Sequence, residues 1–175
     1  MEKNHAVEFK GITKRFGSNV ANNAVDLYLD KGVIMALLGE NGSGKTTLMN
    51  MLAGIYFPDE GRILVDGKAV SIRSPKDSFD LGIGMIHQHF KLIDVMTAAE
   101  NIILGLKGNA VLDMKKVHKD IQELVDRYGF DLDPAQKVYT MSVSQKQTVE
   151  IVKMLYRGAN ILILDEPTAV LTPQE

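Results

Sequence analysis

Residues 33–46 read VIMALLGENGSGKT, and this stretch decides the fold. It opens with a continuous apolar run, Val33–Leu38, which is typical of a strand that is covered on both faces in a parallel sheet. Glycines follow, and Lys45–Ile55 then carries apolar residues at helical spacing. A strand, a glycine-rich loop and a helix in this order begin an α/β unit. We therefore expect an α/β fold with a buried strand over residues 33–38.

The segment Gly39–Thr46 fits the pattern G-x-x-x-x-G-K-[ST] of a phosphate-binding loop. Its glycines let backbone N–H groups approach phosphate oxygens, and the helix that follows points its N-terminus at the anion. A lysine in the first helical turn opposes the helix dipole, which argues against the alternative of a tight turn with a solvated lysine. Lys45 is predicted to contact the β- and γ-phosphates, and Thr46 to supply its hydroxyl to Mg²⁺. The predicted ATP-binding residues of this segment are Gly39, Asn41, Gly42, Ser43, Gly44, Lys45, Thr46 and Thr47.

A second apolar run, Ile161–Leu164, ends in two acidic residues, Asp165 and Glu166. Ligands of open α/β sheets bind at the carboxyl ends of the strands. We expect Asp165 to help hold Mg²⁺, directly or through its waters, and Glu166 to orient or deprotonate an attacking water. The alternative, a pair of acids that caps a loop, loses weight beside an intact phosphate loop.

Composition narrows the class of protein. The chain has 175 residues, 45% of them hydrophobic, which suits a globular domain with a real core. A net charge of −2 argues against a sequence-independent grip on nucleic acid. With no cysteine, disulfides and thiol chemistry are excluded. The longest apolar runs fall far below the roughly 20 residues that span a bilayer, so membrane association should run through a partner protein.

The rest of the chain divides into a strand-rich first part and a helical stretch over residues 97–158. We predict strands at His5–Thr13, Ala21–Asp30, Arg62–Val65 (in a hairpin that turns at Asp66-Gly67) and Gly82–His87, and helices at Lys115–Tyr128 (N-cap Asp113, stop at Gly129) and Gln145–Arg157. The predicted organisation is a single domain over 1–175, with a core of 1–88 and 159–175 and a helical subdomain over about 89–158.

The segments KRFG (14–17), IHQHF (86–90) and ILILDE (161–166), together with the phosphate loop, resemble the ATP-binding subunits of ABC transporters. The resemblance runs along nearly the whole chain and implies the P-loop NTPase fold, a mixed sheet with an antiparallel β subdomain. It implies that Gln88 lies in the loop that touches the transmembrane partner and helps arrange Mg²⁺ and the attacking water. It also implies that Phe16 stacks on adenine. The implied catalytic residues are Glu166, Gln88 and Lys45, and the implied metal residues are Thr46, Gln88 and Asp165.

Longer segments are similar to one group within that family, the importers of nucleosides and simple sugars. They are LGIGMIHQHFKL (81–92), TAAENIILG (97–105) and LYRGANILILDEPTAVLTPQE (155–175). Members of the group carry two ATPase halves in tandem, and this chain matches the first half. The implied partners are permease subunits, a second nucleotide-binding domain and, indirectly, an extracellular substrate-binding protein, with no nucleic acid. The implied location is peripheral, at the cytoplasmic face of the cell membrane.

The family's signature segment aligns with Met141–Gln145 and acts in trans on the ATP held by the opposite half. Ser142, Ser144 and Gln145 are therefore the predicted signature residues. Ser144 stands where the family has a glycine and Thr148 where it usually has an arginine, which should weaken the partner's ATP site. The alternative is that Ser142 or Ser144 N-caps the helix from Gln145.

The chain stops at Glu175, before the family's switch histidine and the closing elements of its core. We therefore expect a truncated domain that lacks the C-terminal part of the core. Such a chain should bind nucleotide with negligible turnover, and an ATP-binding module with little hydrolysis is the first alternative to a transport ATPase. The second is a nucleic-acid-linked ABC ATPase, which the acidic balance and the lack of long charged insertions disfavour.

Overall fold

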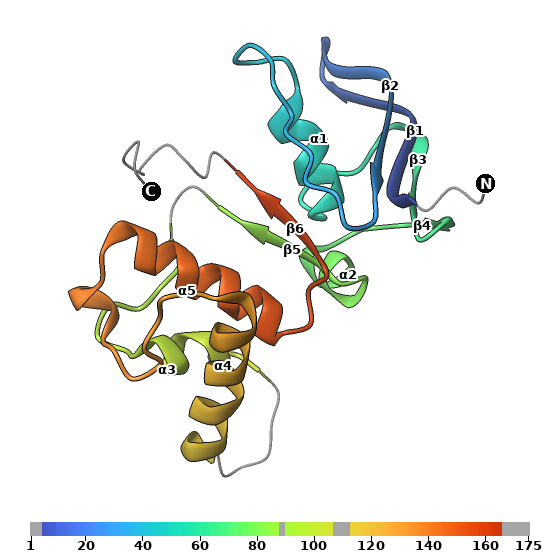
Figure 1. The fold of residues 1–175 in the computed structure, drawn as a ribbon. Helices are drawn as coiled ribbons and strands as arrows, with labels where there is room; N and C mark the ends of the chain where they lie inside the picture. Colours follow the sequence, from blue (N-terminus) through green and yellow to red (C-terminus); the bar gives the residue numbers. More distant parts are fainter. Residues whose placement is uncertain (1–4, 88–89, 107–112, 166–175) are drawn as a thin grey trace. The chain divides into compact units, whose positions relative to one another are not determined.

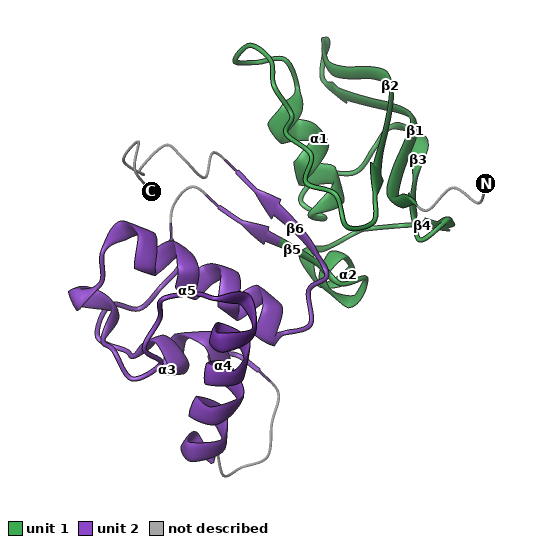
Figure 2. Ribbon diagram, in the orientation of Figure 1, with its two compact units in different colours: residues 1–84 green, residues 85–175 purple. Residues whose placement is uncertain are grey.

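The computed structural model describes residues 5–87, 90–106 and 113–165, and its contacts divide the chain into two compact units, residues 1–84 and 85–175 (Figure 2). Each unit has its own secondary structure and is described by itself. The predicted split into a core of 1–88 and 159–175 and a helical insert of about 89–158 remains a prediction.

Unit 1 is built on an antiparallel sheet with the strand order β2-β1-β3-β4 (Figure 1). The first strand buries Val7 and Phe9, two residues apart on one face, and it also buries the adjacent pairs Ala6-Val7 and Ile12-Thr13, where its pairing with the second strand shifts register. The strands predicted at His5–Thr13, Ala21–Asp30 and Arg62–Val65 and the hairpin turn at Asp66-Gly67 are confirmed, and the first two strands run longer than predicted. The strands are β1 (His5–Phe16), β2 (Asn19–Asp30), β3 (Glu60–Val65) and β4 (Lys68–Val70).

Two helices belong to unit 1, α1 (Lys45–Leu52) and α2 (Pro75–Asp80). The buried face of α1 carries Leu48, Met51 and Leu52, which is the helical spacing that the sequence shows. The helix ends before the predicted Ile55 because the backbone turns at Gly54, which has a φ of 74°.

The predicted buried strand over Val33–Leu38 is wrong. Residues 33–40 form neither helix nor strand, and the side chains of Ile34 and Leu38 are 100% and 91% exposed. A strand needs a hydrogen-bonded neighbour, and the sheet of unit 1 pairs only β1 to β4. The apolar run therefore lacks the flanking strands and covering layers that would bury it.

In unit 2, β5 (Ile83–Ile86, whose first two residues precede the division) pairs with β6 (Ile161–Leu164) in a two-stranded sheet. Figure 1 draws both arrows pointing the same way, and the backbone N–H of Asp165 donates to the carbonyl of Ile86 at 3.1 Å. Both predicted strands are confirmed. The burial predicted for β6 holds for Ile163, whereas Leu164 is 44% exposed.

The helices of unit 2 pack around one apolar core that includes Ile102, Ile121 and Val149. Asp113 caps α4, accepting from the N–H groups of Lys115 and Lys116 at 3.1 and 3.2 Å, and Gly129 ends the helix at a φ of 69°, as predicted. The elements are α3 (Ala98–Ile103), α4 (Met114–Tyr128), a 3₁₀ turn (Val138–Thr140) and α5 (Val143–Tyr156).

Candidate nucleotide-binding site

The loop before α1 closes around the ammonium group of Lys45. Its Nζ atom donates to the carbonyl oxygens of Gly39 and Glu40, both at 2.8 Å, and to the hydroxyl of Ser43 at 3.2 Å. A lysine ammonium has three protons to donate, so these three acceptors match its full capacity. The acceptors are neutral, and the positive charge in the centre of the loop therefore keeps its attraction for an anion.

The N-terminus of α1 is open to an anion as well. Its N-cap is Gly44, no side chain caps the helix, and the first turn contains no acidic residue. In contrast, a Ser, Thr or Asp side chain caps each of the other α-helices in the described part of the chain. Uncapped first-turn N–H groups and the helix dipole together favour a bound anion. Phosphate binding by this loop remains a prediction, and the uncapped helix start is compatible with it.

Gly44 is held tightly against strand β2, in the left-handed region at a φ of 87°. A Cβ atom built on it would lie 2.3 Å from the carbonyl oxygen of Ala21 and 2.8 Å from Nδ2 of Asn22. Only glycine fits this position. Asn22 also donates to the Gly44 carbonyl at 3.2 Å, a contact that sequence reasoning missed.

The remaining residues of the predicted loop face outward. Asn41, Gly42 and Ser43 are exposed, and so is Thr46 in the first turn of α1, whereas Thr47 is half-buried. A hydroxyl oxygen at Thr46 is a donor of the kind that Mg²⁺ prefers.

The second predicted group of site residues belongs to unit 2. Asp165 follows β6, is half-buried, and supplies carboxylate oxygens that suit Mg²⁺. Gln88 and Glu166 lie outside the described residues. Thr46 and Asp165 are thus oxygen donors of a type that fits magnesium, each within its own unit.

Phe16, predicted to contact adenine, ends strand β1 and is 44% exposed. Its ring meets the ring of Tyr56 in an edge-on arrangement, with centroids 5.1 Å apart and planes at 75°. The ammonium of Lys14 lies 5.5 Å from the centroid of the Phe16 ring. The exposed part of the phenyl ring leaves apolar surface on which a base can stack.

Asp59 holds the end of β1 beside Phe16, a contact that sequence reasoning missed. Its carboxylate accepts from the backbone N–H of Arg15 at 2.6 Å and from Nζ of Lys14 at 3.0 Å. The bond from the Arg15 N–H is the main cause that lowers the pKa of Asp59 below its ordinary value of 3.8, and the bond from Lys14 adds to it.

The predicted signature residues begin α5, which starts at Val143, two residues before the predicted Gln145. The hydroxyl of Ser142 accepts from the N–H of Gln145 at 3.2 Å, and Oε1 of Gln145 accepts from the N–H of Ser142 at 3.0 Å. This reciprocal capping box makes Ser142 the N-cap and excludes Ser144 from that role. Ser144 lies in the helix, where its carbonyl accepts from the Thr148 hydroxyl at 3.1 Å.

A buried acid of α5 also escaped sequence reasoning. Glu150 accepts the backbone N–H of Lys91 at 2.9 Å and pairs with Lys153 at 3.7 Å. Nearby, burial lowers the pKa of His87, and the positive charge of Lys91 lowers it further. A glutamate within an amphipathic helix gives no sequence signal of this contact, since most such residues are solvated.

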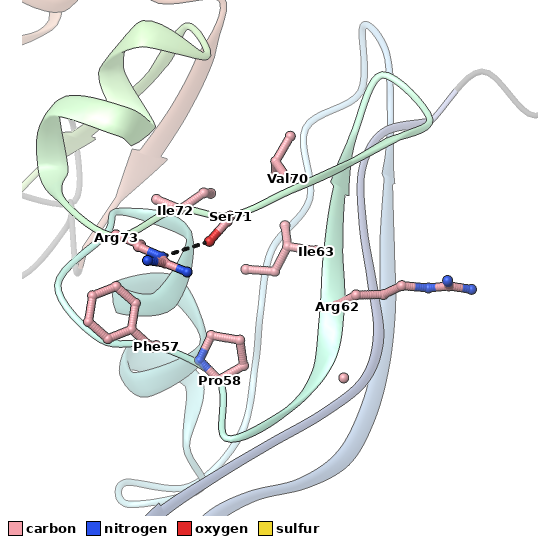
Figure 3. A pocket seen from close by; sticks show the side chains of 9 residues that line it. Phe57, Pro58, Arg62, Ile63, Val70, Ser71, Ile72 and Arg73 are labelled. Atoms are coloured by element: carbon pink, nitrogen blue, oxygen red, sulfur yellow. Dashed lines mark hydrogen bonds between the residues drawn. The ribbon is translucent and has the colours of Figure 1, made fainter.

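A separate pocket of about 510 Å³ lies in unit 1 (Figure 3). Its lining includes Phe57, Pro58 and Ile63, and Nε of Arg73 donates to the hydroxyl of Ser71 at 3.2 Å. Figure 3 shows these side chains around the hollow. No residue of the predicted phosphate loop lines it, so this pocket is not the predicted ATP site.

The sequence comparison and the structure comparison with known proteins lead to the same protein family. A family model described as ABC transporter matches residues 22–169. The chain is 53% identical to the nucleoside import ATP-binding protein NupA of Lactococcus lactis, covering 100% of this chain and 35% of that protein. It is 51% identical to the guanosine import ATP-binding protein NupO of Bacillus subtilis, covering 98% and 34%. The chain thus spans about a third of the length of these curated relatives.

Solved structures show the same fold. The chain aligns with cbiO1 of Clostridium perfringens, part of the ABC transporter complex cbiONQ, at a TM-score of 0.82 and 28% identity, covering 98% of this chain and 69% of that one. It aligns with the ADP conformation of MJ1267, an ATP-binding cassette of an ABC transporter, at a TM-score of 0.85 and 25% identity, covering 97% and 72%.

A glycine-rich loop ahead of α1, an antiparallel sheet and a helical part, together with the solved relatives, define the fold class as that of the ABC ATPase cassettes. The chain belongs to the ABC transporter family, whose ATP-binding members are ATPases. In the described ranges, no helix combines the length and hydropathy that crossing a bilayer requires.

Proposed function

We propose that this chain binds Mg·ATP at Gly39–Thr46, and that the complete protein hydrolyses ATP to power the import of a nucleoside or simple sugar through a membrane permease. The observation that carries the proposal is the ammonium of Lys45, enclosed by the loop at the uncapped start of α1. The N–H groups at the start of α1 and the ammonium of Lys45 would both attract the phosphate groups of a bound nucleotide.

Binding requires an exchange of partners at Lys45. The contact with the Ser43 hydroxyl, at 3.2 Å, is longer than the two contacts with carbonyl oxygens at 2.8 Å. A β- or γ-phosphate oxygen would replace the hydroxyl, because a charged acceptor forms a stronger bond with ammonium than a neutral one. The two carbonyls keep the ammonium in place during the exchange.

The base would stack on the exposed part of Phe16, in the manner of other aromatic contacts with flat rings. A phenyl ring offers no hydrogen bond, so this contact supplies affinity rather than selection among bases. The ring of Tyr56 contacts Phe16 edge-on, with centroids 5.1 Å apart, and leaves the exposed part of the phenyl ring free for the base.

Hydrolysis transfers the γ-phosphoryl group to water. In the proposal Glu166 orients or deprotonates that water and Gln88 helps place it, while Lys45 stabilises the charge on the phosphates. Bound Mg²⁺ would neutralise part of that charge, held by Thr46, Gln88 and Asp165.

The signature residues Ser142, Ser144 and Gln145 would act in trans, on ATP bound by a second nucleotide-binding domain. The Ser142 hydroxyl accepts the Gln145 N–H and retains its own proton, so it can cap α5 and still donate to a phosphate. A helix N-terminus serves both purposes.

The transported substrate class rests on the relatives. The two at 53% and 51% identity are named for nucleoside and guanosine import, and others at 41–45% identity for ribose or glucose import. The proposed partners are permease subunits, a second nucleotide-binding domain and, indirectly, an extracellular substrate-binding protein. The proposed location is the cytoplasmic face of the membrane.

Calorimetry with Mg·ATP tests the proposal. The parent chain should bind, and Lys45→Ala should weaken binding by about 10- to 100-fold, the usual value of a hydrogen bond to a charged group. Lys68→Ala, which removes an exposed lysine of β4, is the matched control and should bind like the parent. Equal affinity of Lys45→Ala and the parent would refute the phosphate-loop role.

A further inference from the structure

Among the described residues, Asn22 is a buried polar residue with an unsatisfied hydrogen-bond acceptor. It lies in strand β2 and is only 6% exposed. Its Oδ1 atom is buried and meets no hydrogen-bond partner in the described structure. An unsatisfied buried oxygen destabilises the folded state, and such a group in a native protein calls for an explanation.

The other end of the same amide makes one contact, and that contact is with the phosphate loop. Nδ2 of Asn22 donates to the carbonyl of Gly44 at 3.2 Å. That carbonyl already accepts the N–H of Leu48 at 2.9 Å, as the first bond of helix α1. The helix therefore does not need Asn22 to satisfy Gly44, and the added bond does not offset the buried Oδ1.

The contact does fix a direction. The Gly44 carbonyl and the Lys45 N–H belong to one planar trans peptide, so both lie in its plane and point in opposite directions. Holding the carbonyl against β2 turns the Lys45 N–H away from the strand. The close approach of Gly44 to the Ala21 carbonyl, 2.3 Å from a built Cβ, keeps this peptide against the strand.

We propose that Asn22 is a positioning residue for phosphate binding, which orients the peptide between Gly44 and Lys45 at the expense of folding stability. The inference rests on the proposed function, because it concerns the affinity of the same loop. It predicts that removing the amide raises stability and lowers affinity. A residue with a purely structural role would move both quantities in the same direction.

The decisive variant is Asn22→Leu, which keeps the approximate volume and removes both polar atoms. We expect its thermal midpoint to rise by about 2–4 °C, since the unsatisfied oxygen is gone. We expect the dissociation constants of Mg·ATP and of inorganic tripolyphosphate to rise by the same factor, about three- to tenfold. The common factor would locate the loss at the phosphates and not at the base.

Two comparisons sharpen this experiment. Asn23→Leu makes the same change at the next, exposed residue of β2 and should alter neither affinity. Phe16→Ala should weaken ATP but not tripolyphosphate, which shows that the two ligands separate base from phosphate contacts. If the parent binds neither ligand, the proposed function itself fails.

If the parent binds both ligands and Asn22→Leu binds them with the parent's affinity, the inference about Asn22 is overturned while the proposed function stands. A lower thermal midpoint of Asn22→Leu would overturn it too, as would failure of this variant to fold. Asn22→Asp keeps the size but places a carboxylate against the Gly44 carbonyl. It should therefore lose affinity for both ligands, and unchanged affinity would also contradict the inference.

Discussion

The ammonium of Lys45 is held by neutral hydrogen-bond acceptors in the described structure, and this affects how easily the loop can bind an anion. Two carbonyls and a hydroxyl hold the ammonium in place without neutralising it. A carboxylate in the same place would form a salt bridge that a phosphate must displace. The Lys45 ammonium can therefore contact a phosphate with little rearrangement of the loop.

Asp59 gives a prediction about pH at the residue scale. Bonds from the Arg15 N–H and the Lys14 ammonium favour its carboxylate and lower its pKa in the folded protein below 3.8. A lowered folded pKa contributes stability that is fully present above the unfolded pKa and is lost as pH falls through the folded pKa. The contribution of Asp59 should therefore be constant near neutral pH and disappear below about pH 4.

Asp59→Asn tests this sign, since the amide does not titrate in that range. The variant should be less stable than the parent at pH 7, and the gap in urea midpoint should narrow as pH falls below the ordinary pKa of 3.8 and through the lowered pKa of Asp59. Asp80→Asn, which changes another exposed acid of unit 1, is the control. A gap that stays constant over this window would show that the charge of Asp59 is not stabilising.

At the scale of elements, helices α1 and α5 differ in how their N-termini are capped. The first turn of α1 has no side-chain cap, whereas Ser142 and Gln145 close the start of α5. Ser142→Ala should lower the free energy of unfolding by about 1 kcal/mol, the usual value of an N-cap. Because the signature is proposed to act in trans, the chain's own affinity for ATP should not change.

Ser144→Ala is the matched comparison, since Ser144 lies within the first turn of α5 and does not cap it. Its effect on urea unfolding should be close to zero or slightly stabilising, because alanine is the better helix former. Equal losses in the two variants would contradict the capping assignment. A drop in ATP affinity in Ser142→Ala alone would contradict action in trans.

Elements that depend on local chemistry were predictable from the sequence, and elements that depend on distant neighbours were not. Asp113, Gly129 and the turn at Asp66-Gly67 act within a few residues, so their positions followed from the sequence. The segment Val33–Leu38 needed flanking strands, which its composition could not supply.

The burial of Asn22 was hidden for a related reason. The pairing of β1 with β2 shifts register between Phe9 and Ile12 and again before Lys14, opposite Asn22. Each irregularity changes which side chains face the interior, so simple alternation fails there. The burial of Asn22 and the bond from the Arg15 N–H to Asp59 therefore could not be predicted from the sequence, whereas Lys45 and Thr46 were proposed from a motif of fixed spacing.

At the scale of the whole molecule, the division into two units predicts that nucleotide binding slows hydrogen exchange in only one of them. Unit 1 contains the proposed phosphate loop, and unit 2 has a core of its own around Ile121 and Val149. A ligand stabilises those amides whose exchange requires opening of its site. ATP should therefore slow hydrogen exchange in α1 and leave exchange in α4 unchanged.

With ATP at a hundredfold excess over its dissociation constant, exchange in α1 should slow by up to about a hundredfold, following the mass-action relation for one site. Lys45→Ala, with its 10- to 100-fold weaker binding, should slow exchange in α1 by only about two- to elevenfold at the same ATP concentration and leave α4 unchanged, which separates specific binding from an effect of the added salt. Equal protection of α4 in the parent would contradict the prediction, because the core of unit 2 would then open only together with the phosphate loop. The two units would in that case unfold as one cooperative body, and nucleotide bound by the first would govern the stability of the second.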